Sequence, residues 1–378
     1  MVGNSPPAEG GTPARPRLLD LSMERLAEEF TALGEPGFRA KQVYDWLHVK
    51  NVHEPAQMTN LPATLRDKLA KKFDHAPLRQ VVRLNSQDGS IKYAFLTRGN
   101  DPIESVVMPS RYGCTLCISS QSGCPMACKF CETGHMGLRS WLSAGEILQQ
   151  LYLAEQDSGQ TVDRIVFMGM GEPLLNLRAL RRVVEILCGE QGRNWSPRRI
   201  TVSTVGIVQP MLKLADTFPR VNLALSLHFT TEGKRREQMP EATHDITELM
   251  AALYYYRRVN GGKVSIEYTL ISGSNDSDDD ARRLVDFARF KGLPQDHPVV
   301  LDAEMQEKPA RMQPLPVHVN LISYNPIPSA GFRGTSEERI DHFAQHLASK
   351  GVPVTVRRSR GQDVGAACGQ LGGKFADN

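Results

Sequence analysis

The sequence predicts an α/β fold in which a partial parallel barrel of the (β/α)6 type follows a small helical domain. From about residue 90 onward, short apolar runs alternate with longer amphipathic stretches, which is the order of parallel strand–helix units. Six or more such units favour a closed or partly closed barrel over an open sheet. Before residue 76, apolar residues recur instead at spacings of three and four, which indicates helices.

The N-terminal part is expected to consist of a disordered segment and an accessory domain. Residues 1–17 are rich in Pro and Gly and lack the apolar run of a signal peptide, so disorder is predicted for them. Within residues 18–85, helices are predicted over 21–34, 39–51 and 61–73, with Ser22 as an N-cap and Gly34 as a stop.

The charge of this accessory domain suggests a partner. Residues 39–83 hold nine Lys or Arg against four Asp or Glu, although the net charge of the whole chain is only +3. A phosphate-rich partner such as RNA would favour such a surface. A solvated helical face would show the same composition, and charge alone leaves both interpretations open.

The second part, 86–378, is predicted to hold the barrel and a C-terminal loop. Strands are expected over 91–97, 103–108, 114–120, 163–168, 199–203, 221–227, 264–271, 317–323 and 353–358. Helices are expected between them, over 143–156, 177–189, 207–216, 245–258, 278–291 and 335–350. Residues 293–316 interrupt this alternation and are predicted to be an irregular insertion.

Polar residues and glycines gather where the predicted strands end. A loop with three cysteines follows the strand at 114–120. The later strands end in GMGEP (169–173), Ser203 with Thr204, SLH (226–228), SGSND (272–276), SYNP (323–326) and GQDVGAACGQLGG (361–373). In a parallel barrel the carboxyl ends of the strands form the active-site face, so these segments are expected to meet in one site.

The cysteines point to metal or redox chemistry. Seven is an odd number, and five of them fall between 114 and 131, which is unlike a disulfide scaffold and favours a cytoplasmic protein. No run of 18 or more apolar residues suggests a membrane span. Cys114, Cys117, Cys128 and Cys131 have the spacing of a zinc ribbon. Alternatively, Cys124, Cys128 and Cys131 bind three irons of a [4Fe–4S] cluster and leave the fourth iron open for a substrate.

Several motifs resemble one known family. GCPMACKFC (123–131) is similar to the signature of radical S-adenosylmethionine (SAM) enzymes. TLCISSQSGCPMACKFCETG, GMGEPLLN, SLH, NLISYNP and VRRSRGQDVGAACGQL together resemble the RlmN/Cfr family of RNA adenosine methyltransferases over roughly residues 100–373. Glu132 after the last cluster cysteine and the 293–316 insertion depart from the family pattern.

The resemblance implies cofactors and their ligands. It implies a radical SAM barrel with a [4Fe–4S] cluster on Cys124, Cys128 and Cys131 and two molecules of SAM per turnover. The residues implied to contact SAM are Gly171, Glu172, Ser203, Ser226, Leu227, His228 and Asn325.

The resemblance also implies three catalytic residues. Cys368 would be methylated by one SAM, and a radical from the second would take a hydrogen atom from the S-methyl group. The resulting carbon radical would add to adenine, and Glu104 would remove a proton from the adduct. Cys117 would then resolve the protein–RNA crosslink through a transient disulfide with Cys368.

The expected activity is methylation of C2 of an adenosine in 23S ribosomal RNA, with transfer RNA as an additional candidate substrate. The alternative within the family is methylation at adenosine C8, as in the Cfr branch. A non-catalytic zinc-ribbon RNA-binding protein is the alternative outside it. A flavodoxin- or ferredoxin-like electron donor is expected as a partner, together with a monomeric state.

Overall fold

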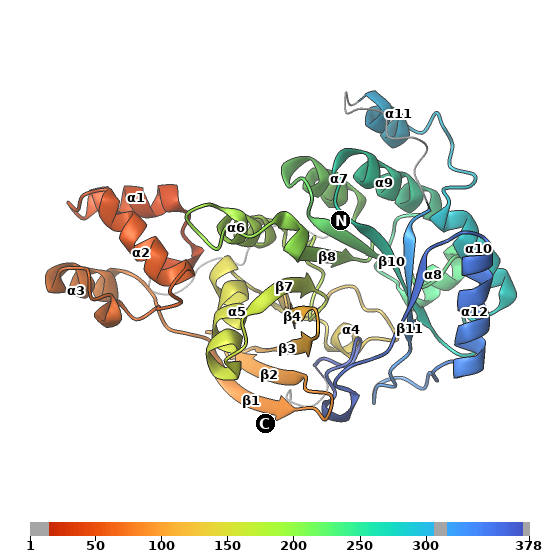
Figure 1. Cartoon of the computed structure of the whole chain (residues 1–378), viewed down its shortest axis with the longest axis horizontal. Helices are drawn as coiled ribbons and strands as arrows, with labels where there is room; N and C mark the ends of the chain where they lie inside the picture. The colour runs from red at the N-terminus through yellow and green to blue at the C-terminus, as the bar shows by residue number, and fades with distance from the viewer. Residues whose placement is uncertain (1–14, 306–315, 373–378) are drawn as a thin grey trace. The chain divides into compact units, whose positions relative to one another are not determined.

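The computed structural model describes residues 15–305 and 316–372 (Figure 1). The chain divides into two compact units: one comprises residues up to 77 together with 189–194, and the other comprises 78–188 and 195 onward. Most of the segment predicted to be disordered, and residues 306–315 of the predicted insertion, lie outside the described residues.

The first unit is helical. Its elements are η1 (Leu18–Asp20), α1 (Met23–Ala32), α2 (Phe38–His48), η2 (Pro55–Gln57) and α3 (Ala63–Lys72). Ser22 caps α1 as predicted, since its hydroxyl accepts the Arg25 N–H at 3.2 Å. Gly34 follows α1 with φ +73°, a conformation that favours glycine. Leu26, Phe30, Val43, Leu47, Leu65 and Leu69 are buried and form the unit's core.

Acid should destabilise this unit because it buries two histidines. Burial lowers the pKa of His48 to about 3 and that of His53 to about 4, from an ordinary 6.5. The unfolded chain therefore binds protons between pH 6.5 and these values while the folded unit does not, so stability falls as the pH falls through this window. At pH 4.5, protonation of His48 in the unfolded chain should alone lower the free energy of unfolding by about 3 kcal/mol. Urea unfolding followed by Trp46 fluorescence measures this loss, and His48→Phe should reduce it.

The second unit is built on a ten-stranded sheet. In spatial order its strands are β1 (Arg79–Asn85), β2 (Ile91–Leu96), β3 (Pro102–Ser110), β4 (Gly113–Cys117), β7 (Val162–Phe167), β8 (Ile200–Thr204), β9 (Asn222–Ser226), β10 (Val264–Leu270), β11 (His318–Ser323) and β12 (Val354–Arg357). β1 to β4 pair antiparallel, and β4 to β12 pair parallel. Within the described residues β12 pairs with β11 and not with β4, so the parallel part is a barrel that stays open, as predicted.

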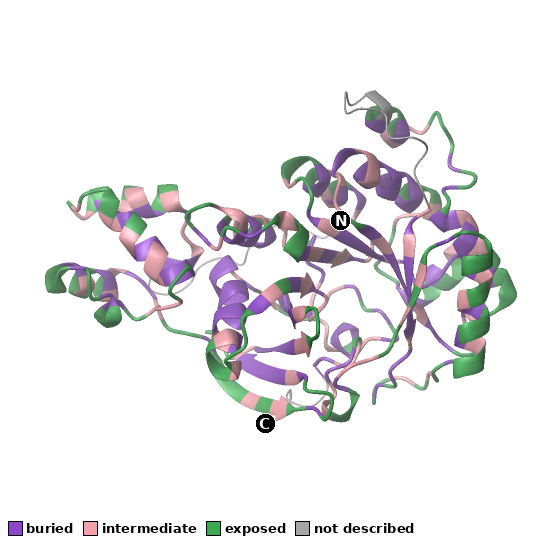
Figure 2. Cartoon of the chain, viewed as in Figure 1, coloured by how far each residue is buried: buried purple, intermediate pink, exposed green. Residues whose placement is uncertain are grey.

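Helices connect the parallel strands. They are α4 (Glu132–Met136), α5 (Ala144–Ser158), α6 (Leu177–Cys188), α7 (Val208–Thr217), α8 (Glu232–Gln238), α9 (Ile246–Val259), α10 (Asp278–Ala288), α11 (Pro298–Met305) and α12 (Glu337–Ser349). The pairs α5 and α6, α7 and α9, and α10 and α12 lie side by side. The strands in the middle of the sheet are largely buried, and so are the sides of the helices that face them (Figure 2). None of the helices in the described residues is long and apolar enough to cross a membrane.

The structure also differs from the predicted elements. The strand expected over 114–120 ends at Cys117, because residues 118–120 leave the sheet to enter the cysteine loop. β1 and the short hairpin of β5 (Gln121–Gly123) and β6 (Leu138–Trp141) were not predicted. β1 is largely exposed, so its sequence lacks a clear apolar face. Part of the insertion predicted to be irregular is the helix α11.

Candidate active site

A cavity of about 160 Å³ lies at the carboxyl ends of the parallel strands β7 to β11. We call it the carboxyl-end cavity. Its lining includes five of the residues predicted to contact SAM, which are Gly171, Glu172, Ser203, Ser226 and His228. Cys131 of the cysteine loop and Cys368 of the C-terminal loop also line it. Leu227 and Asn325 are not among its lining residues.

Gly171 and Glu172 form a tight, buried turn after β7. Gly171 has φ +99°, and a Cβ there would lie 2.7 Å from the Gln121 side chain, so no larger residue fits. The Glu172 carboxylate accepts the Leu174 N–H at 3.0 Å and the Val205 N–H at 2.9 Å. Burial raises the pKa of Glu172 to about 7. The carboxylate therefore joins the loops after β7 and β8. Together with the Thr204 side chain these bonds use three of its acceptor sites, and the remaining one can accept from an ammonium group.

Polar side chains from β8 and β9 lie opposite this turn. The hydroxyls of Ser203 and Ser226 are 3.1 Å apart. His228 has φ +54°, and its Nδ1 accepts the Thr269 N–H at 3.1 Å, which leaves the ring proton on Nε2. Burial, and then the charge of Arg235, lowers the pKa of His228 to about 3, so the imidazole is a neutral donor.

Asn325 occupies a different place. Its side-chain amide donates to the carbonyl of Cys368 at 3.1 Å, and its oxygen accepts from Gln362 at 2.7 Å. The structure therefore places Asn325 against the C-terminal loop rather than at the carboxyl-end cavity.

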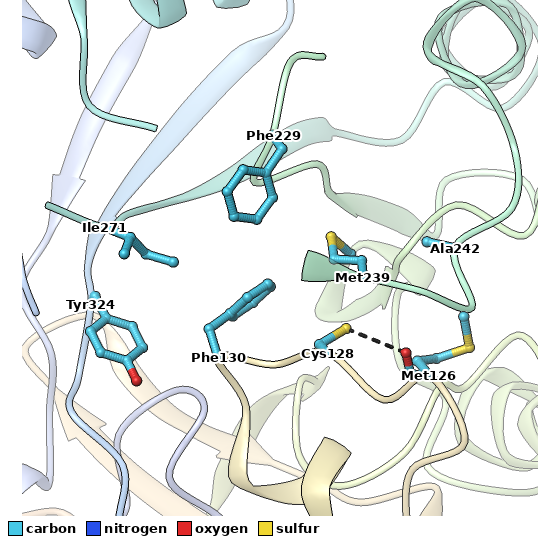
Figure 3. Packing of buried hydrophobic residues seen from close by; sticks show 8 residues of the cluster. All are labelled: Met126, Cys128, Phe130, Phe229, Met239, Ala242, Ile271 and Tyr324. Atoms are coloured by element: carbon cyan, nitrogen blue, oxygen red, sulfur yellow. Dashed lines mark hydrogen bonds between the residues drawn. The ribbon is translucent and has the colours of Figure 1, made fainter. Parts of the chain in front are cut away.

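The three loop cysteines meet in one apolar environment. Cys128 is buried beside Met126 and Phe130, and Cys124 and Cys131 pack against the same cluster (Figure 3). Burial raises the pKa of all three thiols, that of Cys124 to about 12; Cys131 further raises the pKa of Cys124, and Cys131 and Cys124 further raise that of Cys128. Three adjacent buried thiolates need a positive charge beside them, which the iron core of a cluster supplies. The donor set therefore fits a [4Fe–4S] cluster.

The structure places the four cysteines of the zinc-ribbon alternative in different surroundings. Over residues 15–305 and 316–372, no three His, Cys, Asp or Glu side chains converge as ligands of a single metal ion. Cys114 and Cys117 lie on β4, and the thiol next to Cys117 is that of Cys368. Ligands of a [4Fe–4S] cluster bind different irons and need not converge on one point.

The C-terminal loop, residues 361–372, places Cys368 between two cavities. Cys368 lines both the carboxyl-end cavity and a second cavity of about 1310 Å³ inside the barrel, which we call the amino-end cavity. Cys117 lines the amino-end cavity as well. Burial and then the neighbouring Cys368 raise the pKa of Cys117 far above 9. All seven cysteines lie in the described residues, and all are free thiols.

Glu104 lies on β3 beneath this loop. The residue is 1% exposed, and its Oε2 accepts the Gly372 N–H at 2.8 Å. Among the described residues, the buried Oε1 atom has no hydrogen-bond partner. Burial raises the pKa of Glu104 above 4.5, although Lys92 and Gly372 oppose that shift. A carboxylate with a raised pKa and an unpartnered oxygen is suited to accept a proton.

Two buried charges near the site were not predicted. Glu267 on β10 lines the carboxyl-end cavity, and its Oε1 accepts from Ser265 at 2.8 Å and from Asn320 at 2.7 Å. Arg235 on α8 is 1% exposed and donates to the carbonyl of Leu227 at 2.7 Å. The sequence contained a sign of Glu267, because a carboxylate inside the apolar strand VSIEYTL indicates a buried charge with a role. Arg235 had no such sign, because nearly all other residues of helix α8 are polar as well.

The amino-end cavity is basic. Its charged lining residues are all cations: Arg164, Arg198, Lys263, Arg357, Arg358 and Arg360. Apolar side chains such as Val106, Val166 and Leu371 line it as well, and it reaches Cys117 and Cys368. Its surface therefore combines positive charge with apolar area that leads to the two thiols.

Comparison with known proteins identifies the family. Residues 17–74 match a family model described as the ribosomal RNA large subunit methyltransferase N-terminal domain, and residues 118–285 match the radical SAM superfamily. A Myxococcus xanthus protein named "Dual-specificity RNA methyltransferase RlmN 2" is 40% identical over 95% of this chain and 92% of its own length. The chain belongs to the RlmN family.

Other RlmN proteins and one solved structure agree. The "Dual-specificity RNA methyltransferase RlmN" of Anaeromyxobacter dehalogenans is 37% identical over 94% of this chain and 91% of its own length. The crystal structure of a radical SAM methyltransferase from Sphaerobacter thermophilus superposes with a TM-score of 0.84 at 40% identity, covering 94% and 98% of the two chains. The predicted family and fold are thus confirmed, and this RlmN family member is a SAM-dependent methyltransferase that uses a [4Fe–4S] cluster.

Proposed function

We propose that this RlmN family protein methylates C2 of an adenosine in 23S ribosomal RNA, and that it also accepts transfer RNA. The observation that supports this most directly is the position of Cys368, which lines both the carboxyl-end and the amino-end cavity. A thiol in this position can receive a methyl group on one side and present it to a base on the other. The curated relatives carry the name dual-specificity RNA methyltransferase.

The carboxyl-end cavity is proposed to hold SAM beside the cluster. Cys124, Cys128 and Cys131 would hold the cluster, which when bound would provide the electron for SAM cleavage. Glu172 would accept from the SAM ammonium group, and Gly171 lets the backbone approach it. Ser203, Ser226 and the neutral His228 supply hydroxyl groups and an N–H for its other polar atoms, with Leu227 and Asn325 as further proposed contacts.

The residues around the C-terminal loop are proposed to handle the methyl group. Cys368 would hold it as S-methylcysteine, since an aromatic adenine carbon is not a nucleophile. Glu104 would accept the proton that leaves the adenine ring carbon through its unpartnered Oε1. The Cys117 thiolate would then attack the Cys368 sulfur, so that an S–S bond forms while the bond from sulfur to the transferred carbon breaks. The carbon would leave with the bonding electron pair and take up a proton, which completes the methyl group.

The basic lining of the amino-end cavity supports RNA as the substrate. Its six cations can neutralise phosphates, and its apolar walls can hold an unstacked base near both thiols. The helical first unit, which matches the N-terminal domain of the family, is proposed to add RNA contacts. A flavodoxin- or ferredoxin-like electron donor, a monomeric state and a cytoplasmic location complete the proposal.

Mass spectrometry of the RNA product tests this function. Protein purified without oxygen is mixed with SAM, a reductant and unmethylated ribosomal or transfer RNA, and the RNA is digested to nucleosides. We expect 2-methyladenosine from the native protein and none from Cys368→Ala. A product of 8-methyladenosine would assign the protein to the C8 reaction, and an unmodified RNA with intact SAM cleavage would contradict the proposal.

A further inference from the structure

A buried lysine, Lys92 on β2, lies between the proposed base and the C-terminal loop. Its Nζ atom is 3.0 Å from Oε2 of Glu104, and the side chains are 3% and 2% exposed. The same Nζ donates to the carbonyl of Gly365 at 2.9 Å. Lys92 and Glu104 are on adjacent antiparallel strands, where Lys92 pairs with Val106 and Glu104 with Ala94.

The ion pair reaches both ends of the segment that holds Cys368. Gly365, which Lys92 binds, precedes the thiol by three residues, and Gly372, whose N–H binds Glu104, follows it by four. Both glycines have positive φ, +61° and +103°. At Gly372 an added Cβ would meet the sulfur of Met136, so the loop packs closely against that side chain there. One cation and one carboxylate thus hold the ends of residues 365–372.

The pair also divides the two oxygens of Glu104 between two tasks. Oε2 interacts with Lys92 and accepts the Gly372 N–H, whereas Oε1 has no hydrogen-bond partner in the part of the chain that the structure describes. Lys92 is the charged group that acts on the Glu104 carboxylate. Ser119, which follows β4, donates to the main-chain carbonyl of Glu104 and not to its carboxylate. A buried carboxylate without a cation would take up a proton and could not act as a base.

We propose that Lys92 is a positioning residue for the methyl transfer: it keeps Glu104 ionised with Oε1 available, and it fixes both ends of the Cys368 loop through the same ion pair. This rests on the proposed function, in which Glu104 is the base and Cys368 the methyl carrier. When Oε1 accepts a proton, Glu104 becomes neutral and the ion pair with Lys92 is lost. Protonation of Glu104 therefore loosens the loop, and in the next step the Cys368 sulfur must approach Cys117.

The pH profile of RNA methylation in Lys92→Met separates this role from a structural one. Removal of the cation raises the pKa of Glu104, so the acidic limb of the profile should move up by about one pH unit. At pH values below the native acidic limb the rate should fall about tenfold, because there one unit changes the ionised fraction tenfold, and it should recover toward pH 9. Lys92→Arg, which keeps the positive charge, should return the acidic limb to its native pH. Lys92→Gln, which keeps a donor for Gly365 but no charge, should behave like Lys92→Met.

Asp363→Asn is the matched control. Asp363 anchors the same loop through Ser86 at 2.6 Å and the Gln87 N–H at 3.0 Å, without contact to Glu104. This variant should reduce the rate at every pH and leave the acidic limb in place. Glu104→Gln imitates the protonated base, and alkylation of Cys368 by iodoacetamide at a fixed pH should be faster in it than in the native protein.

Each result decides a separate claim. An unchanged acidic limb in Lys92→Met and Lys92→Gln, with iron content and SAM cleavage intact, would overturn the proposal. Equal alkylation of Cys368 in Glu104→Gln and the native protein would overturn the fixing of the loop. Failure of the native protein to form any methyladenosine would instead contradict the proposed function.

Discussion

Replacing Cys128 by alanine should remove the iron and abolish both SAM cleavage and RNA methylation. Cys128 lies at the centre of the three-cysteine loop, and its thiol is buried among Met126, Phe130 and Phe229. The chain offers one thiolate for each of three irons, so loss of one leaves the cluster two ligands. Iron and sulfide analysis of anaerobically purified protein, with a measurement of 5′-deoxyadenosine, tests this expectation. The loss in SAM cleavage should exceed 100-fold, which corresponds to about 3 kcal/mol in the barrier.

Cys188→Ala is the matched control for this experiment. Cys188 is a partly buried free thiol at the end of α6, outside both cavities. Its replacement removes one sulfur without touching the loop, so iron content and activity should stay at the native level. A Cys128→Ala protein that retained nearly four irons would contradict the proposed ligand set.

Replacing Cys117 by alanine should trap the protein on its RNA. Without the Cys117 thiolate, nothing attacks the Cys368 sulfur, so the carbon bridge between Cys368 and adenine persists. We expect a covalent complex that survives denaturing electrophoresis and disappears on ribonuclease treatment. Release of methylated RNA should drop by at least about 100-fold, while SAM cleavage continues for one turnover.

Cys114 provides the matched control on the same strand. It is buried three residues before Cys117 on β4, its N–H donates to Asp163 at 2.7 Å, and it lines neither cavity. Cys114→Ala should release methylated RNA without a trapped complex. Adding Cys368→Ala to Cys117→Ala should prevent the complex, and a complex in that double variant would exclude Cys368 as the point of attachment.

The parallel barrel could be predicted because its strands are short apolar runs with helices between them. Strands buried on both faces, such as NLALS (222–226), show this pattern clearly. The site could be located because glycines and polar residues follow these strands at the edge where parallel strands end. Gly171, Glu172, Ser203, Ser226 and His228 were brought together in this way.

Other features depend on contacts between distant segments, which a local pattern does not contain. β1 has no buried face, so only its pairing with β2 reveals it as a strand. Lys92 looks like a surface residue in the run IKYAFL, yet it is buried and bonded to the C-terminal loop. Asn325 follows a barrel strand as a ligand of SAM would, yet the structure turns its amide to Cys368 and Gln362.

The C-terminal loop also imposes an order on the biogenesis of the enzyme. It is bonded to residues near the start of the second unit, through Ser86 to Asp363, Lys92 to Gly365 and Glu104 to Gly372, across separations of 268 to 277 residues. During synthesis, β2 and β3 emerge long before the segment that completes their polar contacts. The nascent barrel can therefore acquire its sheet early, but the reactive thiol can join the site only after residues 361–372 have been synthesised. A chain truncated before residue 361 should fold most of its sheet and still be inert, because Lys92 and Glu104 would lack the loop that they bind.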